Sequence, residues 1–500
     1  MSEGGTILTG DLAGKGLDAL NARVRNDREL LCRRPANWVP PRIVDGDRVV
    51  DVAVIGGGMC GLVAAFALLS SGITNIRIFD RNPAGFEGPW VNYARMETLR
   101  SPKQLTGPAF GMASLTFRAW FTVQFGDAAW EALDKIPRTM WMDYLRWFRS
   151  VLAIPVENET SIDRIMPAGE HLRLDLSGAG ARQPRVLARK VVMATGRDGT
   201  GHPNIPAFVR DLPKRFWAHS SDDIDFKALK GRRVAVVGVG ASAVDNSAEA
   251  LEAAEVRHLI RRKTMPTINK MMGIGSYGFT AAFPRLVDAW RWRFMHYSFV
   301  TQTPAPRGST LRVSRHPNAY FHFGKVIERI AHDSRELEIV MTDGTRLKTD
   351  FVILGTGFTV EPLARTELDG YADKILLWRD RYQPPADLAH SEIGNFPYLS
   401  EDFAFQERVP GEAPWLSSIH CFNYGATISL GKVSGDIPAI SDGAEWLARE
   451  LAARLYAEDV EQHFQAMEEY DKPELLGDEW RESPLESEVE PEKPALKTGS

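Results

Sequence analysis

The sequence has little cysteine and no excess of positive charge. Its 500 residues include only Cys32, Cys60 and Cys421, and no two of them form a CxxC pair. A disulfide framework and a thiol-redox motif are therefore not expected, and the simplest prediction is a reducing, cytoplasmic location. The formal net charge is −5, which gives no reason to expect a nucleic-acid partner.

The sequence also lacks an unbroken hydrophobic run long enough to suggest a membrane span. The best candidate, residues 49–72, is interrupted by Asp51 and by three consecutive glycines, so a strand, a tight turn and a buried helix describe it better. No GxSxG elbow or P-loop occurs, which disfavours a hydrolase or an NTPase. His316 and His322 have no partner at metal-ligand spacing, so no metal site is expected.

Strand-like and helical segments alternate over most of the chain, which predicts an α/β fold with parallel sheets. The length is too great for one ordinary core, so at least two domains are expected. Residues 1–48 form a predicted N-terminal helical arm that ends in a proline-rich stretch. Residues 471–500 are rich in Glu, Pro and Lys, and a disordered tail is predicted there.

Two segments repeat one motif at widely separated positions. Residues 51–72, DVAVIGGGMCGLVAAFALLSSG, and residues 232–254, RRVAVVGVGASAVDNSAEALEAA, both read as strand, glycine turn and helix. In such a unit the glycines permit a tight turn, the approach of a pyrophosphate, and close packing of helix on strand. The motif predicts two dinucleotide-binding loops, one with Gly56, Gly58, Met59, Cys60 and Gly61, the other with Gly238, Gly240, Ser242 and Ala243.

The strands that follow the two loops end in opposite charges. Asp80, followed by Arg81, lies 24 residues after Gly56, and Arg262 lies 24 residues after Gly238. The equal offset predicts the same structural position. A carboxylate there accepts hydrogen bonds from a free ribose diol, whereas cations pair with the 2′-phosphate of NADP. The first unit is therefore predicted to bind FAD and the second NADPH, through Arg261, Arg262 and Lys263; a solvated strand end is the alternative interpretation of these three cations.

Several further motifs between residues 50 and 440 resemble those of the class B flavin monooxygenases, which include flavin-containing, Baeyer–Villiger and N-hydroxylating enzymes. They are RKVVMATG with Thr195 and Gly196, TDFVILGTG ending at Gly357, GPWVNY with Trp90, and GKVSGDIP with Asp436. HSSDD at His219 lacks the aromatic neighbours of the Baeyer–Villiger fingerprint, which disfavours that subgroup.

The resemblance implies two Rossmann-like dinucleotide-binding domains, with the NADPH domain inserted into the FAD domain. The expected boundaries are an FAD-binding part at 49–206, an NADPH-binding domain at 207–345 with a helical insert at 274–300, and a second FAD-binding part with a closing helix at 346–470. The aromatic insert reads as a substrate lid, as a helix packed on the core, or as a monotopic membrane contact, the last of which is disfavoured because no one-sided apolar face emerges.

The resemblance also implies chemistry in which NADPH reduces FAD and a C4a-(hydro)peroxyflavin passes one atom of O2 to a small molecule. A nitrogen or other heteroatom is the first expectation for the oxidised atom. Lys103 or Arg100 is the expected cation beside the flavin, and Asn269 is expected near the nicotinamide. Two alternatives stay open: an FAD-dependent oxidoreductase without oxygenation, and a non-catalytic flavoprotein sensor. A homo-oligomer is compatible with the sequence.

Overall fold

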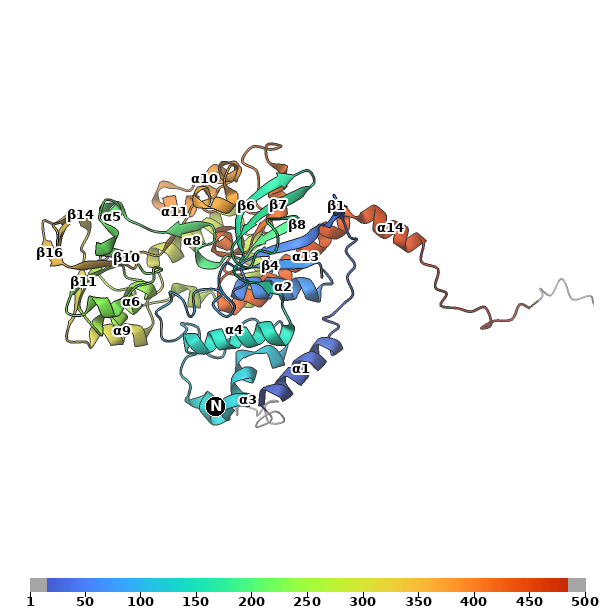
Figure 1. Cartoon of the computed structure of the whole chain (residues 1–500), viewed down its shortest axis with the longest axis horizontal. Coiled ribbons are helices and arrows are strands. Elements are labelled where there is room, and N and C mark those ends of the chain that lie inside the picture. The colour runs from blue at the N-terminus through green and yellow to red at the C-terminus, as the bar shows by residue number, and fades with distance from the viewer. Residues whose placement is uncertain (1–15, 484–500) are drawn as a thin grey trace, which may run out of the picture. The chain divides into compact units, whose positions relative to one another are not determined.

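The computed structural model describes residues 16–483. The chain forms one large compact unit up to Leu455 and a small unit from Tyr456 onward. The α-helices are α1 Gly16–Leu30, α2 Met59–Ser70, α3 Phe117–Ala132, α4 Arg138–Leu152, α5 Ala207–Arg210, α6 Ala241–Leu251, α7 Tyr277–Ala282, α8 Asp288–Thr301, α9 Arg307–Ser314, α10 Trp378–Arg381, α11 Ser391–Gly394, α12 Thr427–Leu430, α13 Ile440–Glu458 and α14 Val460–Glu468 (Figure 1).

The first sheet is built around two long buried strands. Its order is β5 Val156–Glu157, β4 Ile76–Phe79, β3 Val50–Ile55, β8 Arg185–Met193, β7 His171–Ser177 and β6 Ser161–Ala168. Strands β3, β4, β5 and β8 are parallel, whereas β6 and β7 run antiparallel. The short strand β19 Ile419–Cys421 pairs parallel with the end of β8, so a late segment of the chain completes the sheet next to the first glycine loop.

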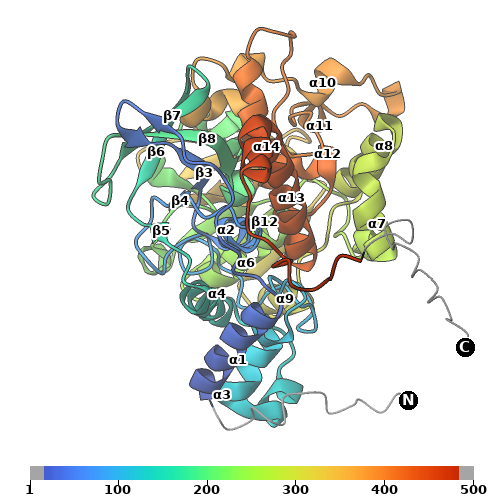
Figure 2. The same cartoon turned by 90° about the vertical axis from the view of Figure 1, so that its right-hand side faces the viewer.

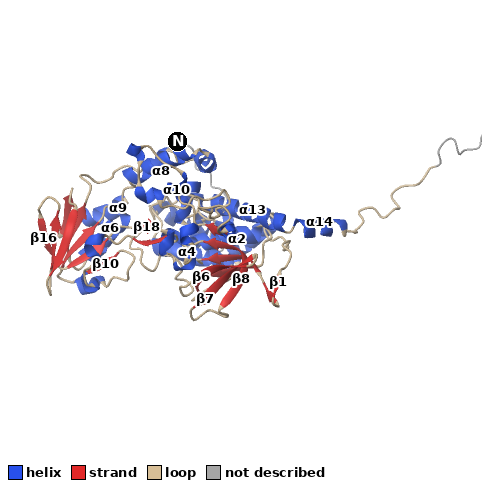
Figure 3. Ribbon diagram, turned by 90° about the horizontal axis from the view of Figure 1, so that it is seen from above, coloured by secondary structure: helices blue, strands red, loops and turns tan. Residues whose placement is uncertain are grey.

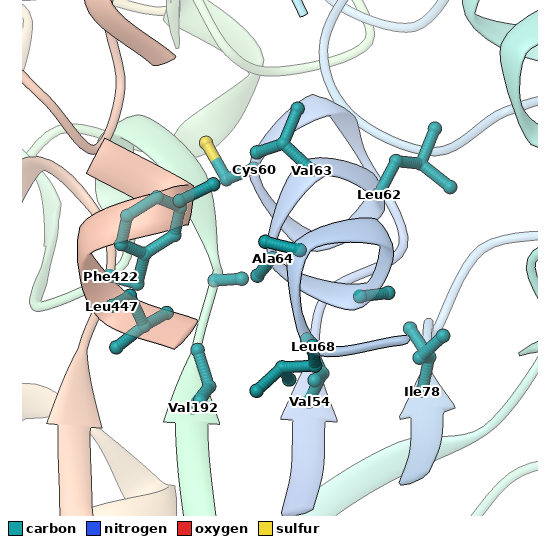
Figure 4. Packing of buried hydrophobic residues seen from close by; sticks show 14 of the residues in the cluster. Val54, Cys60, Leu62, Val63, Ala64, Leu68, Ile78, Val192, Phe422 and Leu447 are labelled. Atoms are coloured by element: carbon teal, nitrogen blue, oxygen red, sulfur yellow. The ribbon is translucent and has the colours of Figure 1, made fainter. Parts of the chain in front are cut away.

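The core of this sheet follows from the hydrophobic sequence of its central strand and helix. Every residue of β3 is buried, as expected of a parallel strand covered on both faces. Helix α2 buries its first ten residues. Its Ala64 and Leu68 lie toward Val54 of the central strand (Figure 4), in one hydrophobic cluster with Leu62, Val63, Ile78 and Val192. An all-round apolar helix of twelve residues is thus a buried core helix, as predicted for residues 49–72.

The second sheet is entirely parallel. Its order is β10 Trp217–His219, β17 Phe351–Leu354, β11 Arg233–Val237, β12 Glu255–Ile260 and β13 Ala319–Phe323. Figure 3 shows its strands apart from those of the first sheet. Strand β17 belongs to this sheet, so the sheet includes residues up to Leu354. The predicted α/β class with two Rossmann-like units is confirmed.

Smaller sheets connect and extend these two. A three-stranded antiparallel sheet contains β14 Ile327–His332, β15 Leu337–Met341 and β16 Arg346–Thr349. Where the chain crosses between the two large sheets, β9 Gly201–Pro203 on the way out pairs antiparallel with β18 Phe358–Val360 on the way back. Near the N-terminus, β1 Ile43–Val44 pairs with β2 Asp47–Arg48.

The described part of the N-terminal arm is a helix that packs on the first domain. Leu20 and Val24 of α1 are buried, and α1 lies beside α3 in Figure 2. Asp27 accepts a hydrogen bond from the Ser114 hydroxyl (2.6 Å), and Asn21 accepts one from the Trp147 indole (2.8 Å). Residues 1–15 of the predicted arm lie outside the described residues.

The aromatic insert at 274–300 forms α7 and α8 and packs on the second half of the first domain. Phe283, Trp292 and Met295 are buried in one cluster with Trp378 and Ile428. The Trp292 indole donates to the Leu388 carbonyl (2.8 Å). The packing agrees with the interpretation of this segment as a helical insert on the core.

Helix α14 and the chain after it belong to the small unit. Residues 471–483 contain no helix or strand and are exposed, and residues 484–500 of the predicted disordered tail lie outside the described residues. Within residues 16–483, no helix is long and apolar enough to cross a membrane.

Candidate cofactor and active site

The first glycine loop is shaped by close backbone contacts that no larger residue permits. Gly56 adopts φ +105°, and a Cβ atom there would lie 2.6 Å from the Ala194 carbonyl oxygen. A Cβ on Gly61 would lie 1.8 Å from the Gly56 carbonyl oxygen. Gly58 has nothing closer than 3.6 Å to its Cβ position. The loop is therefore closed toward the sheet and the helix, while the backbone at Gly58 is accessible, as a pyrophosphate site requires.

Asp80 follows β4 directly and lies next to this loop. Its carboxylate accepts hydrogen bonds from the Gly57 amide (2.7 Å) and from the Asn82 amide (2.8 Å). The side chain is buried, so two backbone donors fix its orientation toward the loop. A carboxylate held in this place is positioned for a ribose diol.

A cavity of about 640 Å³ extends from this loop along the ends of the strands. It is lined by nine of the residues that the sequence assigned to cofactor binding: Gly56, Gly58, Met59, Cys60, Asp80, Arg81, Trp90, Thr195 and Gly196. Gly61 lies beneath the loop, and Gly435 lines the cavity next to Asp436. The Asp436 carboxylate pairs with the Lys432 ammonium at 3.8 Å. The first set of predicted residues is thus brought together around one hollow.

The second glycine loop has the same design with a small difference. A Cβ on Gly238 would lie 2.4 Å from the Gly355 carbonyl oxygen, whereas Gly240 faces open space. Ala243 replaces the third glycine, and its side chain occupies the space that a Cβ on Gly355 would need. Ser242 is exposed in the first turn of α6. An accessible backbone at Gly240 again leaves room for a pyrophosphate.

The strand pairing corrects the expectation that Asp80 and Arg262 occupy the same structural position. Ile55 pairs with Phe79 in the first unit, and Val237 pairs with Leu259 in the second. The residue that corresponds to Asp80 is therefore Ile260, which is fully buried. The equal offset in residue number misleads because the second unit is two residues shorter between loop and strand end.

The three cations follow this position and differ in their contacts. Arg261 and Lys263 are exposed. The Arg262 guanidinium donates to the Gln302 side-chain oxygen (3.0 Å) and to the Val300 carbonyl at the end of α8. Arg262 is therefore held against the insert, whereas Arg261, one residue after Ile260, is free to meet a phosphate near the loop.

The residues expected to act beside the flavin are not gathered in one place. The Lys103 ammonium is buried and donates to the carbonyls of Trp130 (2.5 Å) and Glu131 (3.3 Å), so it points into the α3 region and away from the cavity. Arg100 is near Asp436 and Arg197, and burial lowers the pKa of its guanidinium. Between the two cations expected there, the geometry favours Arg100.

Asn269 and Gly357 belong to the second domain and its return crossing. Asn269 precedes a short 3₁₀ helix, and its side-chain oxygen is buried without a hydrogen bond among the described residues. The Gly357 carbonyl accepts from His219 Nε2 (2.9 Å) and from the Asn204 amide (2.8 Å). His219 thus ties the second sheet to the crossing strands.

Sequence reasoning missed a polar group next to the cavity: Arg197, Glu392, Tyr424 and Lys432. The Arg197 guanidinium carbon lies 3.7 Å from the centre of the Tyr424 ring. Burial raises the pKa of Glu392 and lowers that of Lys432, and the charge of Arg197 acts on both. These residues come from four separate loops and short helices, so their spacing in the sequence carries no signal. Two motifs pointed to this place: Arg197 follows RKVVMATG, and Lys432 lies within GKVSGDIP.

No cluster of three or more metal-ligating side chains occurs within residues 16–483.

Known proteins with similar sequences include a family of nucleotide-binding oxidoreductases and an FAD-dependent enzyme. A family model described as pyridine nucleotide-disulphide oxidoreductase matches residues 53–273. An FAD-dependent urate hydroxylase from Xanthomonas campestris pv. campestris is 36% identical over 467 residues, which cover 92% of this chain and 98% of that protein.

Solved structures agree on the fold. An ornithine hydroxylase from Pseudomonas aeruginosa is 18% identical with a TM-score of 0.63, and the match covers 81% of this chain and 100% of that one. An FAD-bound cadaverine monooxygenase from Erwinia amylovora is 16% identical with a TM-score of 0.62, and the match covers 82% and 95% of the two chains.

Proposed function

This chain belongs to the class B flavin monooxygenases, and from that premise we propose that it is an NADPH- and FAD-dependent monooxygenase that hydroxylates urate or a closely related planar heterocyclic anion. The observation that carries the proposal is the 36% identity to an FAD-dependent urate hydroxylase over nearly the full length of both proteins. The match spans both glycine loops and the cavity between the first loop and Gly435.

The residues of the first unit fit FAD. A Cβ atom is excluded at Gly56 and Gly61 but not at Gly58, so the loop offers its backbone to a pyrophosphate at the N-terminus of α2. Asp80 would hold the ribose diol, and Trp90, Thr195 and Gly196 line the space beyond it. The lining therefore supports a dinucleotide in an extended form along the strand ends.

The residues of the second unit fit NADPH. Gly238 and Gly240 form the loop, Ser242 and Ala243 begin α6, and Arg261 with Lys263 supplies exposed positive charge after β12. A 2′-phosphate is a dianionic group that pairs best with such cations. Because Arg262 is held by Gln302, we assign it a supporting role and Arg261 the leading one.

Bound FAD would supply the redox chemistry that transfers electrons from NADPH and activates dioxygen. The chain's own contribution is positioning and electrostatics. Arg100 and Lys432 place positive charge beside Asp436, where it would stabilise negative charge that develops during oxygen transfer. Lys432 is half-buried, which strengthens its field relative to a charge in water, whereas Arg100 is more exposed.

The proposal is tested with purified protein reconstituted with FAD. We expect a yellow protein that oxidises NADPH in air, with oxygen uptake that rises on addition of urate and a hydroxylated product detected by mass spectrometry. Ornithine and cadaverine serve as matched trials, because they are the amines named for the structural neighbours. Tight coupling to an amine in place of urate would contradict the substrate assignment, and a colourless protein that ignores NADPH would contradict the monooxygenase itself.

A further inference from the structure

Arg197 lies at the wall of the cavity, and its side chain has no hydrogen-bond or ion-pair partner among the described residues. It belongs to the short 3₁₀ helix Gly196–Asp198 that follows β8, and it lines the cavity. Its guanidinium carbon lies 3.7 Å from the centre of the Tyr424 ring. A guanidinium that lies on an aromatic ring keeps its N–H groups available at the edge of its plane.

The ring beneath Arg197 is itself held in place. Tyr424 begins the 3₁₀ helix Tyr424–Ala426, next to α12. Its ring makes an edge contact with Phe396, with centroids 5.5 Å apart and planes at 67°. Phe396 is fully buried. The platform for the guanidinium is therefore fixed by the core, which reduces the entropy that Arg197 loses when it binds a ligand.

Charged side chains of both signs lie around Arg197, and Asp198 follows it in the cavity wall. Lys432 pairs with Asp436, and Arg100 lies within range of the same carboxylate. Glu392 is the carboxyl group that faces Arg197 from α11, and burial raises its pKa, which favours its neutral form relative to a carboxyl group in water. The guanidinium of Arg197 offers an anion charged hydrogen-bond donors in the cavity wall, which a protonated amine could not use.

We propose that Arg197, supported by the Tyr424 ring, is the residue that determines substrate specificity, and that it binds the edge of a planar heterocyclic anion such as urate. The flat fork of the guanidinium donates two parallel hydrogen bonds to adjacent carbonyl or deprotonated ring atoms. A flat ligand hydrogen-bonded to this edge would lie in the same plane as the guanidinium, next to the Tyr424 ring. The assignment rests on the function proposed above, because it takes the substrate to be bound in the same cavity as FAD.

The test compares two substitutions at Arg197 with a matched substitution elsewhere. Arg197→Gln removes the charge, and Arg197→Lys keeps the charge but removes the fork. Arg182→Gln is the control, because Arg182 is exposed in the turn between β7 and β8. We expect the KM for urate to rise about 10- to 100-fold in Arg197→Gln, as for the loss of hydrogen bonds to a charged group, and less in Arg197→Lys. The control should match the unaltered protein.

A second readout separates substrate binding from cofactor binding. FAD content and the rate of flavin reduction by NADPH without urate are measured in both Arg197 variants, and the assignment predicts that the fold-change in the KM for urate exceeds the fold-change in either quantity. A KM for urate within threefold of the unaltered protein, or a loss of FAD with KM unchanged, would overturn the assignment. Tyr424→Phe should keep the low KM, whereas Tyr424→Leu, which removes the platform, should raise it.

Failure of the proposed function is recognised separately. If the unaltered protein is yellow and oxidises NADPH but does not hydroxylate urate, thermal-shift titrations with urate and xanthine, and with ornithine as the amine, decide the inference. Stabilisation by a heterocyclic anion that disappears in Arg197→Gln supports the role of Arg197. Stabilisation by ornithine alone, or by no compound in a way that depends on Arg197, contradicts it.

Discussion

The two dinucleotide-binding units share one design but differ at the third glycine and at the end of the second strand. In the unit of β3, α2 and β4, Gly61 lies against the Gly56 carbonyl, and an acid, Asp80, follows the strand. In the unit of β11, α6 and β12, Ala243 fills the corresponding place, and the residue that matches Asp80 is the buried Ile260. The comparison teaches that the residue after the second strand of a unit indicates which nucleotide the unit prefers. That residue must be identified from the strand pairing, because counting residues from the glycine loop gives a different one.

The largest expected effect tests the tighter packing of the first unit. In Gly61→Ala the new Cβ would meet a backbone oxygen at 1.8 Å, so α2 must move away from β3 at a cost of about 3 kcal/mol. FAD content, measured by absorbance, and the free energy of unfolding should both fall. Ala243→Gly in the second unit is the matched control and should cost only about 1 kcal/mol. Equal losses in both units would contradict the comparison.

The next prediction concerns a histidine that only the second unit buries. His258 donates from Nε2 to the Gly238 carbonyl (2.8 Å), at the position that Ile78 occupies in the first unit. Burial lowers its pKa to about 4. The unfolded chain therefore binds the extra proton between pH 6.5 and 4, and stability falls as pH falls through that window, by roughly 3 kcal/mol. Urea unfolding at each pH measures this slope.

The variant His258→Leu removes that pH-dependent part and should reduce the slope between pH 6.5 and 4, whatever its effect on stability at neutral pH. The part that remains comes in part from His420, which is also buried and whose pKa burial lowers to about 4. His316→Leu, outside the core, is the control and should leave the slope unchanged. A slope in His258→Leu equal to that of the unaltered protein would show that other groups carry the acid sensitivity.

Asp80 gives the third effect. Asp80→Asn removes the charge from a group that the Gly57 and Asn82 amides hold toward the ribose site. We expect FAD to bind about 10- to 100-fold more weakly, the cost of losing charge-assisted hydrogen bonds, while the KM for NADPH stays the same. Titration of the apoprotein with FAD, followed by flavin fluorescence, measures the change. A parallel loss of NADPH affinity would mean that the two units are not independent.

The smallest effect distinguishes the adjacent arginines of the second unit. Arg261→Gln should raise the KM for NADPH about tenfold and leave that for NADH unchanged, because only NADPH carries the 2′-phosphate. Arg262→Gln should have a weaker effect, since its guanidinium already binds Gln302. The ratio of the two KM values in each variant is the measurement. A larger effect at Arg262 than at Arg261 would contradict this assignment. It would support the prediction from residue counting that Arg262 binds the 2′-phosphate.

Much of this architecture is readable in the sequence because it rests on local rules. The two glycine loops, the strand before each and the helix after each follow from side-chain size and hydrophobic pattern, and the structure places them as predicted. Counting residues failed at Arg262 because a loop two residues shorter moves every later position, and only the strand pairing reveals it.

The polar residues next to the cavity could not be predicted from such local rules. Glu392, Tyr424 and Lys432 meet Arg197 through long-range folding, and none of them belongs to a periodic segment. Lys103 shows the converse: a lysine in a promising motif is turned by the fold to the carbonyls at the end of α3. Side-chain direction in irregular segments depends on the whole packing, which no short motif encodes.

The paired crossing strands β9 and β18 set how the two large sheets can move. Gly201 approaches Thr359 so closely that a Cβ would lie 1.8 Å from its carbonyl oxygen, and three residue pairs join the strands. Two connections that are hydrogen-bonded along their length behave as one ribbon, which flexes across its flat face but resists sliding lengthwise. Lengthwise sliding of the reductant's domain against the flavin's domain would break these hydrogen bonds, whereas a hinge-like swing about the ribbon would keep them.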